Sequence, residues 1–142
     1  MAAPNQVPIF TLTPRIEVST HGDISSARDS ISPADLFSAG SFGSRIERIT
    51  VLSKCKHAGT NTSKMIWLCI FDGTDWAILD EQLMSAVTPD ATTAGAVVIF
   101  DYTSRGGLIL SPSAHLGISY NSSSGYAGAD DDLYITIEGG DY

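Results

Sequence analysis

Few residues in this chain have the types and spacing needed for metal or acid–base chemistry. The three histidines, His21, His57 and His115, occur singly, whereas a zinc site needs three or four converging ligands. The sequence has no G-x-S-x-G motif, and its many serines lie in segments rich in turn-forming residues. We therefore expect no catalytic residue, no metal site and no cofactor, and we expect that the protein is not an enzyme.

The densest acidic cluster is the run Asp130, Asp131 and Asp132. Clustered carboxylates on a loop suit hard cations such as calcium. The spacing does not match the twelve-residue calcium loop, in which acidic ligands alternate with other residues and a glycine follows. We interpret residues 121–132 as an acidic, solvated loop, and the sequence leaves open whether it binds a cation, a glycan or nothing.

Tyrosines and cysteines are the remaining candidates. An aromatic ring offers apolar area with a polar tip, so the tyrosines suit either a sugar-stacking face or the core and rim of the domain. They are Tyr102, Tyr120, Tyr126, Tyr134 and Tyr142. Cys69 lies in an apolar run and Cys55 lies near a predicted strand end. Whether they are paired stays open, because a disulfide depends on a Cα separation that a sequence does not show.

The composition excludes several classes of partner. The formal net charge is −8 with only eight lysines and arginines, which argues against a nucleic-acid-binding surface, because such a surface is basic. No apolar run reaches the roughly 18 residues of a membrane-spanning helix. The first ten residues also lack the basic and apolar regions of a secretory signal. We expect neither nucleic acid nor membrane as a partner.

The elements that must position these residues are short strands, and the clearest are two within residues 64–79. Met65, Trp67, Cys69 and Phe71 alternate with a second apolar set, so this strand should be covered on both faces. An Asp-Gly dipeptide at 72–73 separates it from the next run, which is a strong signal for a β-hairpin. We expect this hairpin at the centre of a β-sandwich.

Other strands are predicted by alternation and β-propensity. Residues 15–20 should form a half-buried strand with Ile16 and Val18 on its apolar face. In residues 43–54, Ile46 and Ile49 differ in parity, which predicts two partly covered faces or a β-bulge. Further strands are expected at 33–40, where a helical turn is the alternative, and at 80–87, 95–102, 108–110, 115–120 and 132–138.

This pattern predicts one all-β domain, an antiparallel β-sandwich of jelly-roll type over residues 15–142. Residues 1–14 are predicted to form an extended N-terminal arm, because three prolines interrupt the segment. Its apolar residues are candidate partner-binding anchors. The candidate partner-binding residues of the whole chain are Val7, Ile9, Phe10 and Leu12 in the arm, with Tyr126 and Tyr142.

Six segments in a fixed order resemble a family of small tailed-phage and prophage virion structural proteins. They read PIFTLTP at 8–14, GSRIERITV at 43–51, FDGT at 71–74, SAVTPDAT at 85–92, GLILSPSAHLGIS at 107–119 and EGGDY at 138–142. The resemblance spans most of the chain and depends on the order and spacing of the segments. Two places depart from the family's pattern: the loop GTNTSK at 59–64, and residues 121–132, which are longer and more acidic than usual.

The resemblance implies a bacteriophage virion protein that is assembled in the cytoplasm of the bacterial host. Members are mostly of unassigned function, and the role it favours is a capsid decoration or cement protein. Such a protein would dock on the major capsid protein as a homo-oligomer, with a homotrimer favoured. The alternative is a tail, fibre or spike-base component that binds other virion proteins or host-surface glycans.

Overall fold

The computed structural model describes residues 13–122 and 128–142, which form nine strands and two short 3-10 helices. The strands are β1 (Thr13–His21), β2 (Ala34–Ser38), β3 (Ser44–Ser53), β4 (Lys64–Phe71), β5 (Trp76–Met84), β6 (Val97–Asp101), β7 (Leu108–Leu110), β8 (His115–Ser122) and β9 (Leu133–Asp141). The helices are η1 (Thr103–Arg105) and η2 (Gly128–Asp130). Because β1 begins at Thr13, the last two residues of the predicted arm belong to a strand; the rest of the arm lies outside the described residues.

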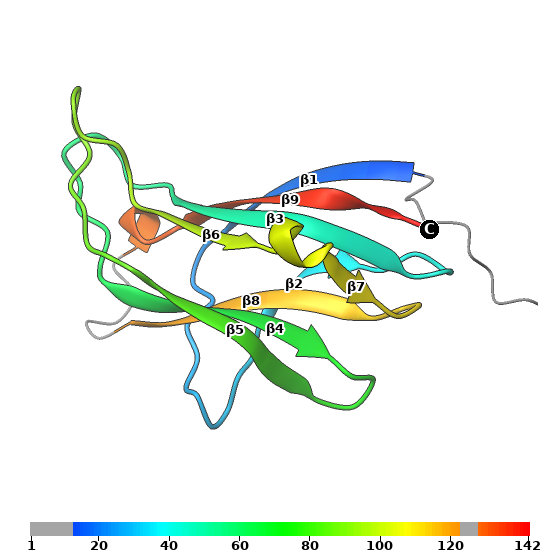
Figure 1. Cartoon of the computed structure of the whole chain (residues 1–142). Coiled ribbons are helices and arrows are strands. Elements are labelled where there is room, and N and C mark those ends of the chain that lie inside the picture. The colour runs from blue at the N-terminus through cyan, green and yellow to red at the C-terminus, as the bar shows by residue number, and fades with distance from the viewer. Residues whose placement is uncertain (1–12, 123–127) are drawn as a thin grey trace, which may run out of the picture.

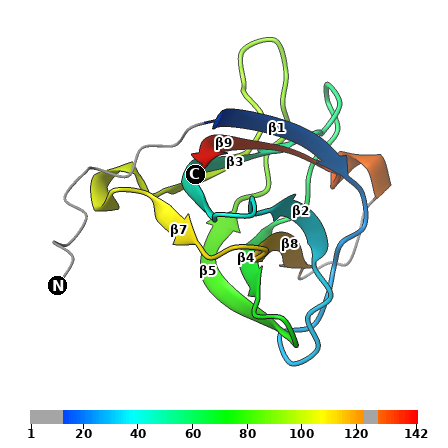
Figure 2. The same cartoon turned by 90° about the vertical axis from the view of Figure 1, so that its right-hand side faces the viewer.

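Two antiparallel sheets pack face to face (Figures 1 and 2). The first sheet has the order β1-β9-β3-β6, with β7 also paired to β3, and the second has the order β2-β8-β4-β5. The first and last strands are therefore neighbours, and the chain crosses repeatedly between the layers. A five-stranded and a four-stranded sheet wound in this way form a jelly roll, so the predicted all-β jelly-roll sandwich is confirmed.

The core between the sheets is built from alternate residues of each strand. Ile49 and Val51 of β3 lie opposite Ile137 and Ile135 of β9, and all four are buried. The second sheet contributes buried residues from β4 and β8: Ile66, Leu68, Leu116, Ile118 and Tyr120. The predicted bulge in β3 is present between Ile46 and Arg48, and it explains the change of parity along that strand.

The predicted hairpin of β4 and β5 is confirmed. Asp72 accepts hydrogen bonds from the backbone N–H groups of Thr74 and Asp75 at 2.8 and 2.9 Å, and Gly73 has φ +102°, a conformation that glycine adopts readily. Residues 80–84 continue β5, so the run 80–87 is not a separate strand. The segment at 33–40 contains the strand β2, as the sequence favoured.

Strand β4 is covered on both faces, but the two covers differ. Ile66 and Leu68 face the core, whereas Trp67 and Cys69 lie on the outer face of the second sheet and are buried there. The connection between β1 and β2, which hangs below the second sheet in Figure 1, covers part of this outer face. The Arg28 guanidinium lies 5.4 Å from the Trp67 ring centroid, and Ser119 donates a 2.7 Å hydrogen bond to the carbonyl of Ile24.

Strand β1 differs from the prediction, because its aliphatic face points outward. Ile16 and Val18 are 74% and 69% exposed, whereas Arg15 and Glu17 face the inner side. The reason is that β1 is an edge strand with polar residues on its inner side. Arg15 hydrogen-bonds the carbonyl of Ser38 on β2 at 3.1 Å and the carboxylate of Asp141 at 3.0 Å, so its charge closes this side of the sandwich.

A buried ion pair joins the two layers at the other end of the sandwich. Lys64, the first residue of β4, pairs with Asp131, just before β9, and both side chains have 0% exposure. The Asp131 carboxylate also accepts hydrogen bonds from the N–H and hydroxyl of Thr62, both at 2.7 Å. The Lys64 ammonium group lies 4.8 Å from the Tyr120 ring centroid.

The interpretation of the acidic run as a solvated loop tip is therefore wrong. Each of the three aspartates pairs with one of the chain's three lysines: Asp131 with Lys64, Asp132 with Lys54 at 3.4 Å, and Asp130 with Lys56 at 3.9 Å. Lys64 and Asp131 are 67 residues apart in the sequence, and Lys54 and Asp132 are 78 residues apart. The alternation of residues within a single strand does not reveal such long-range pairs. The run fixes the start of β9 and does not form a free anionic surface.

We expect Lys64→Met to lower the free energy of unfolding by about 3–5 kcal/mol, because it leaves the Asp131 carboxylate buried without its counter-charge. Lys56→Met is the matched control, since that side chain is 77% exposed and its loss should change stability by about 0.5 kcal/mol or less. Urea unfolding followed by tryptophan fluorescence measures both. Equal stability of the two variants would contradict the central role of the buried pair.

Candidate functional site

The outer face of the first sheet carries an exposed apolar surface, which we name the aliphatic face. It is built from side chains that alternate with core residues on four strands, so the same pleat that fills the core also presents them to solvent. Its members are Ile16 and Val18 of β1, Leu52 of β3, Val97 and Ile99 of β6, and Tyr134 of β9. Each of them is at least 40% exposed.

The strand register makes these side chains contiguous. Leu52 lies between Val97 on one neighbouring strand and Tyr134 on the other. One row along, Thr50 lies between Ile99 and Thr136, and Thr136 lies beside Val18. Threonine methyl groups thus fill the gaps between aliphatic side chains, and the surface extends across the whole width of the sheet.

Ion pairs border the aliphatic face. Arg48 lies between Asp101 and Glu138 in the next row and pairs with them at 3.4 and 3.8 Å. All three side chains are 42–45% exposed, so this network contributes little to stability. The network combines one guanidinium with two carboxylates, so this border of the aliphatic face carries a net negative charge.

The two sheets differ in how their outer faces are covered. On the second sheet, the 22–33 connection lies over Trp67, and the Trp76 ring packs on Gly117, where a Cβ would be only 2.7 Å from the ring. Among the described residues, no comparable segment crosses the aliphatic face. Among the described residues, the first sheet therefore has the less covered outer face.

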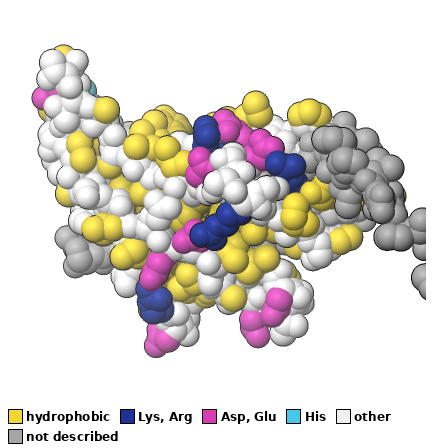
Figure 3. Space-filling view, viewed as in Figure 1, with side chains coloured by type: hydrophobic (Ala, Val, Ile, Leu, Met, Phe, Trp, Pro, Cys, Tyr) yellow, Lys and Arg dark blue, Asp and Glu magenta, His cyan; other side chains and the backbone are white. Residues whose placement is uncertain are grey.

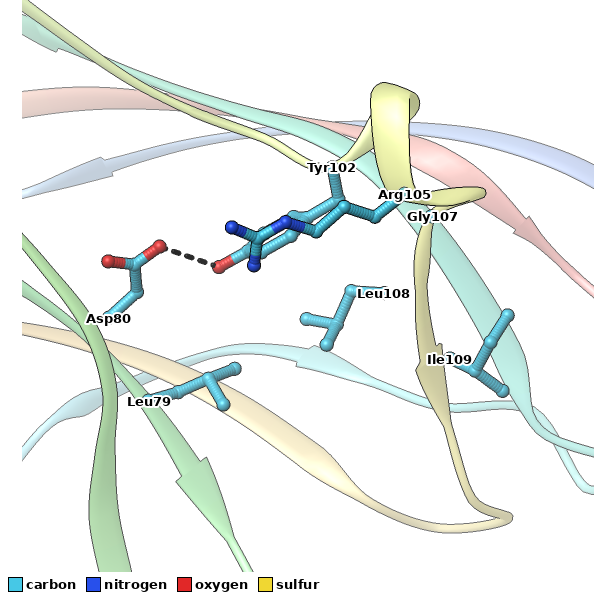
Figure 4. A pocket seen from close by; sticks show the side chains of 7 residues that line it. All are labelled: Leu79, Asp80, Tyr102, Arg105, Gly107, Leu108 and Ile109. Carbon is cyan, nitrogen blue, oxygen red and sulfur yellow. Dashed lines mark hydrogen bonds between the residues drawn. The ribbon is translucent and has the colours of Figure 1, made fainter.

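A groove of about 390 Å³ opens between β5 and the β6–β7 connection (Figure 4). Its lining comprises Leu79, Asp80, Tyr102, Arg105, Gly107, Leu108 and Ile109. The Tyr102 hydroxyl donates a 3.2 Å hydrogen bond to Asp80, and burial, together with this carboxylate, raises the pKa of Tyr102 above its usual range. The phenol therefore stays protonated and holds β5 against the first sheet.

The same groove lies on the side of the molecule shown in Figure 3, where hydrophobic side chains surround a few acidic and basic ones. Beside it, Gln82 donates a 2.8 Å hydrogen bond to the carbonyl of Ile99. These contacts join β5 of the second sheet to the first sheet along one long side of the sandwich. Arg15 joins the two sheets along the opposite side. The polar groups of the groove are thus mainly engaged in holding the layers together.

Titratable residues elsewhere form turns or surface pairs. Among the described residues, no group of three or more histidine, cysteine or acidic side chains is arranged to hold a metal ion. Asp23, Asp72, Asp90 and Asp101 each accept a hydrogen bond from a backbone N–H two residues further on. Hydrogen bonds lower the pKa of each carboxyl group: mainly those from hydroxyl groups for Asp23 and Asp101, and mainly those from backbone N–H groups for Asp72 and Asp90. Much of the acidic character of the chain therefore resides in turn-forming aspartates.

Both cysteines are free, which settles the pairing that the sequence left open. Burial raises the pKa of the Cys69 thiol to about 11, and burial and the nearby Asp130 carboxylate raise that of Cys55. A nucleophilic cysteine needs a lowered pKa, because the thiolate is the reactive form. Neither environment activates its thiol.

The predicted partner-binding residues are mostly outside the described part of the chain. Val7, Ile9, Phe10, Leu12 and Tyr126 all lie outside it. Tyr142 is described: it is half-buried beside the turn between β2 and β3, where its N–H donates a 3.1 Å hydrogen bond to the carbonyl of Gly43. The predictions for the five residues outside the described part of the chain therefore remain predictions.

Sequence reasoning missed the aliphatic face, although a signal for it was present. Val97 and Ile99 share one parity of their strand, while Val98 and Phe100 share the other. An antiparallel sheet usually has one apolar and one polar face, so apolar residues of both parities indicate either a second cover or an exposed patch. The second reading applies to β6, where Val97 is 52% exposed.

No family model matches this chain, and no curated protein matches it either. Two similar solved structures come from infectious bursal disease virus: the virus of the Gt strain (17% identity, TM-score 0.30) and the VP2 subviral particle (19% identity, TM-score 0.29). Each match covers 98% of this chain, which spans 35% and 36% of those chains. Such scores are too low to carry a functional argument, and the assignment of the fold rests on the strand order.

In the folded protein, we expect a thiol reagent at pH 8 to modify Cys55 slowly and Cys69 only as fast as the protein unfolds, since Cys69 is fully buried and its pKa is about 11. Both thiols should react at once in urea without reductant. Cys55→Ser should abolish the early phase. Fast modification of Cys69 in the native protein, or loss of both thiols in urea, would contradict the structure.

Proposed function

We propose that this chain is a structural protein of a tailed-phage virion that decorates the capsid through the aliphatic face. The observation that carries the proposal is the exposed apolar surface over four strands of a jelly roll whose other sheet is partly covered by the 22–33 connection. Contiguous apolar patches on a soluble protein mark interaction sites, because water around them is released when a partner covers them. A protein with such a face is suited to binding another protein.

The sequence supports the virion assignment independently. The six segments that resemble phage virion proteins include parts of strands β3, β7, β8 and β9, so the resemblance extends over both sheets. The fold and the resemblance favour a structural role by analogy, but they do not identify which surface binds a partner. The aliphatic face supplies a physical location for that role.

The proposed partner is the major capsid protein, and assembly takes place in the host cytoplasm. The expected homotrimer belongs to the same proposal: several copies docked side by side would each contribute one aliphatic face and one N-terminal arm. An arm that adds a strand to a neighbour gains affinity from backbone hydrogen bonds and specificity from alternate side chains.

The second candidate is a tail, fibre or spike-base component. The groove between β5 and β7 favours it, because Tyr102 and Arg105 place an aromatic ring and a planar cation beside apolar walls, a combination that suits glycans or peptides. The two functions differ in where the protein is found. A decoration protein purifies with heads, and a tail component purifies with tails.

We expect Val97→Asp to reduce occupancy on purified capsids by about tenfold or more, since it buries a charge in the proposed interface. Leu83→Asp is the matched control: both residues are on edge strands, and they are 52% and 59% exposed on different surfaces. Capsids lacking the protein are incubated with each variant, and bound protein is measured after sedimentation. Equal binding of the two variants would contradict docking through the aliphatic face.

Deletion of residues 2–12 tests the arm separately. The deletion ends before β1, so the sandwich should stay folded and keep its unfolding midpoint. We expect capsid occupancy to fall, because the apolar anchors Val7, Ile9, Phe10 and Leu12 are lost. Full occupancy by the truncated protein would show that the arm has no part in docking and would leave the aliphatic face as the binding surface.

A further inference from the structure

The four edges of the two sheets are not equally protected. An edge strand presents unpaired N–H and C=O groups, and proteins usually shorten, bulge or cover such strands to prevent association. Strands β2 and β6 have only five residues each, β2 has an irregular register, and the Ile99 carbonyl of β6 accepts a hydrogen bond from Gln82. Strand β5 is interrupted by a bulge opposite Leu68 and Cys69.

Strand β1 is neither short nor bulged, and the devices that it carries are Pro14 near its start and the inward-pointing charges of Arg15 and Glu17. All nine of its residues pair with β9 in one unbroken register, and within residues 13–122 and 128–142 it has no strand on its other side. Its outward side chains include Ile16 and Val18, at 74% and 69% exposure. A long, regular and apolar edge of this kind is a template for another strand.

Pro14 indicates which backbone groups are available. Proline has no N–H, and in sheets it is accommodated where the missing donor would face away from the neighbouring strand. Pro14 is opposite Gly140 of β9, and hydrogen-bonding groups alternate along an antiparallel strand. The N–H and C=O groups of Ile16, Val18 and Thr20 are therefore directed to the free edge.

We propose that β1 pairs with β1 of a second copy of this chain, antiparallel and around a two-fold axis at Val18, so that the first sheets of both copies form one continuous sheet. The occupant is a second copy because the residues of β1 are compatible with those of an identical strand when the axis lies at Val18. This pairing goes beyond capsid docking, since it uses a strand edge and leaves the outer faces of β3, β6 and β9 available.

The alternative two-fold registers are less favourable. An axis at Glu17 places that carboxylate opposite its own copy, and like charges in direct cross-strand pairs are destabilising. An axis at Ile16 places Pro14 opposite the second copy's Val18 at both ends, so two hydrogen bonds are lost. Both defects are absent when the axis lies at Val18.

With the axis at Val18, the cross-strand pairs are compatible on both faces. On the outer face Val18 meets its own copy and Ile16 meets the second copy's Thr20, which are pairs that β-branched residues form well. On the inner side Glu17 meets Ser19, and Arg15 meets His21. Burial lowers the pKa of His21, so this imidazole is neutral at neutral pH and does not repel the guanidinium.

The pairing forms about six backbone hydrogen bonds, two in each of three pairs of residues. It also joins the aliphatic faces of both copies into one surface of twice the width, since Ile16 and Val18 lie at the border of each face. Two copies that bind together would present this doubled surface to any partner.

The test is the mass of the full chain in solution, measured by light scattering after size-exclusion chromatography over a range of concentrations. We expect an even multiple of the protomer mass, either a dimer or, where the proposed trimer also forms in solution, a hexamer. We expect Val18→Pro to halve this mass, because it removes an N–H that the fold itself does not use, and an odd multiple for the parent would overturn the proposal. Val18→Thr keeps both the N–H and the β-branch and should keep the parent mass. Circular dichroism and thermal unfolding confirm that each variant is folded.

If Val18→Pro does not fold, Val18→Lys replaces it, since a lysine on an edge strand opposes pairing and should also halve the mass. A monomeric parent at millimolar concentration would overturn the proposal, and so would an unchanged mass in a folded Val18→Pro or Val18→Lys protein. Val97→Asp should leave the mass unchanged while it reduces capsid occupancy. The failure of the pairing and the failure of capsid docking are thereby distinguished.

Discussion

The buried pair of Lys64 and Asp131 is the interaction on which the arrangement of the sandwich depends most directly. Lys64 begins β4 of the second sheet, and Asp131 precedes β9 of the first, so the pair fixes where two strands of different layers start. Desolvation of two charges is costly and leaves little net stability, but a single partner left alone would be far worse. The pair therefore acts mainly as a positional constraint: a shift of β9 by one residue would bury an unpaired charge.

Polar contacts also determine how the two long sides of the sandwich are closed. Arg15 bridges β1 to β2, and on the opposite side Gln82 and the Tyr102–Asp80 pair bridge β5 to β6. Both sheets of a jelly roll have edge strands, and an apolar side chain on an edge strand would be partly exposed to solvent. Each of these bridges thus gives a polar group at the rim a hydrogen-bond partner in the opposite layer.

Much of the fold could be predicted from the sequence, because strands, the hairpin and the bulge in β3 depend on local alternation and turn chemistry. The face of a strand that becomes buried is a different matter. Ile16 and Val18 have the parity of a half-buried strand, but the surrounding topology makes β1 an edge, and its inner side is occupied by a charged pair. The role of Asp131 depends on a lysine 67 residues away. Both outcomes are set by tertiary pairing, which no single window of sequence contains.

Tertiary pairing also determines how the charges of this acidic chain are arranged. Seven of the eight basic residues form ion pairs among the described residues, and several aspartates are engaged in turns. The like net charge of the copies disfavours non-specific association, and at physiological salt this repulsion is screened beyond about 8–10 Å. At contact distance, the aliphatic face and the free edge of β1 are the surfaces that the described part of the chain leaves open to a partner.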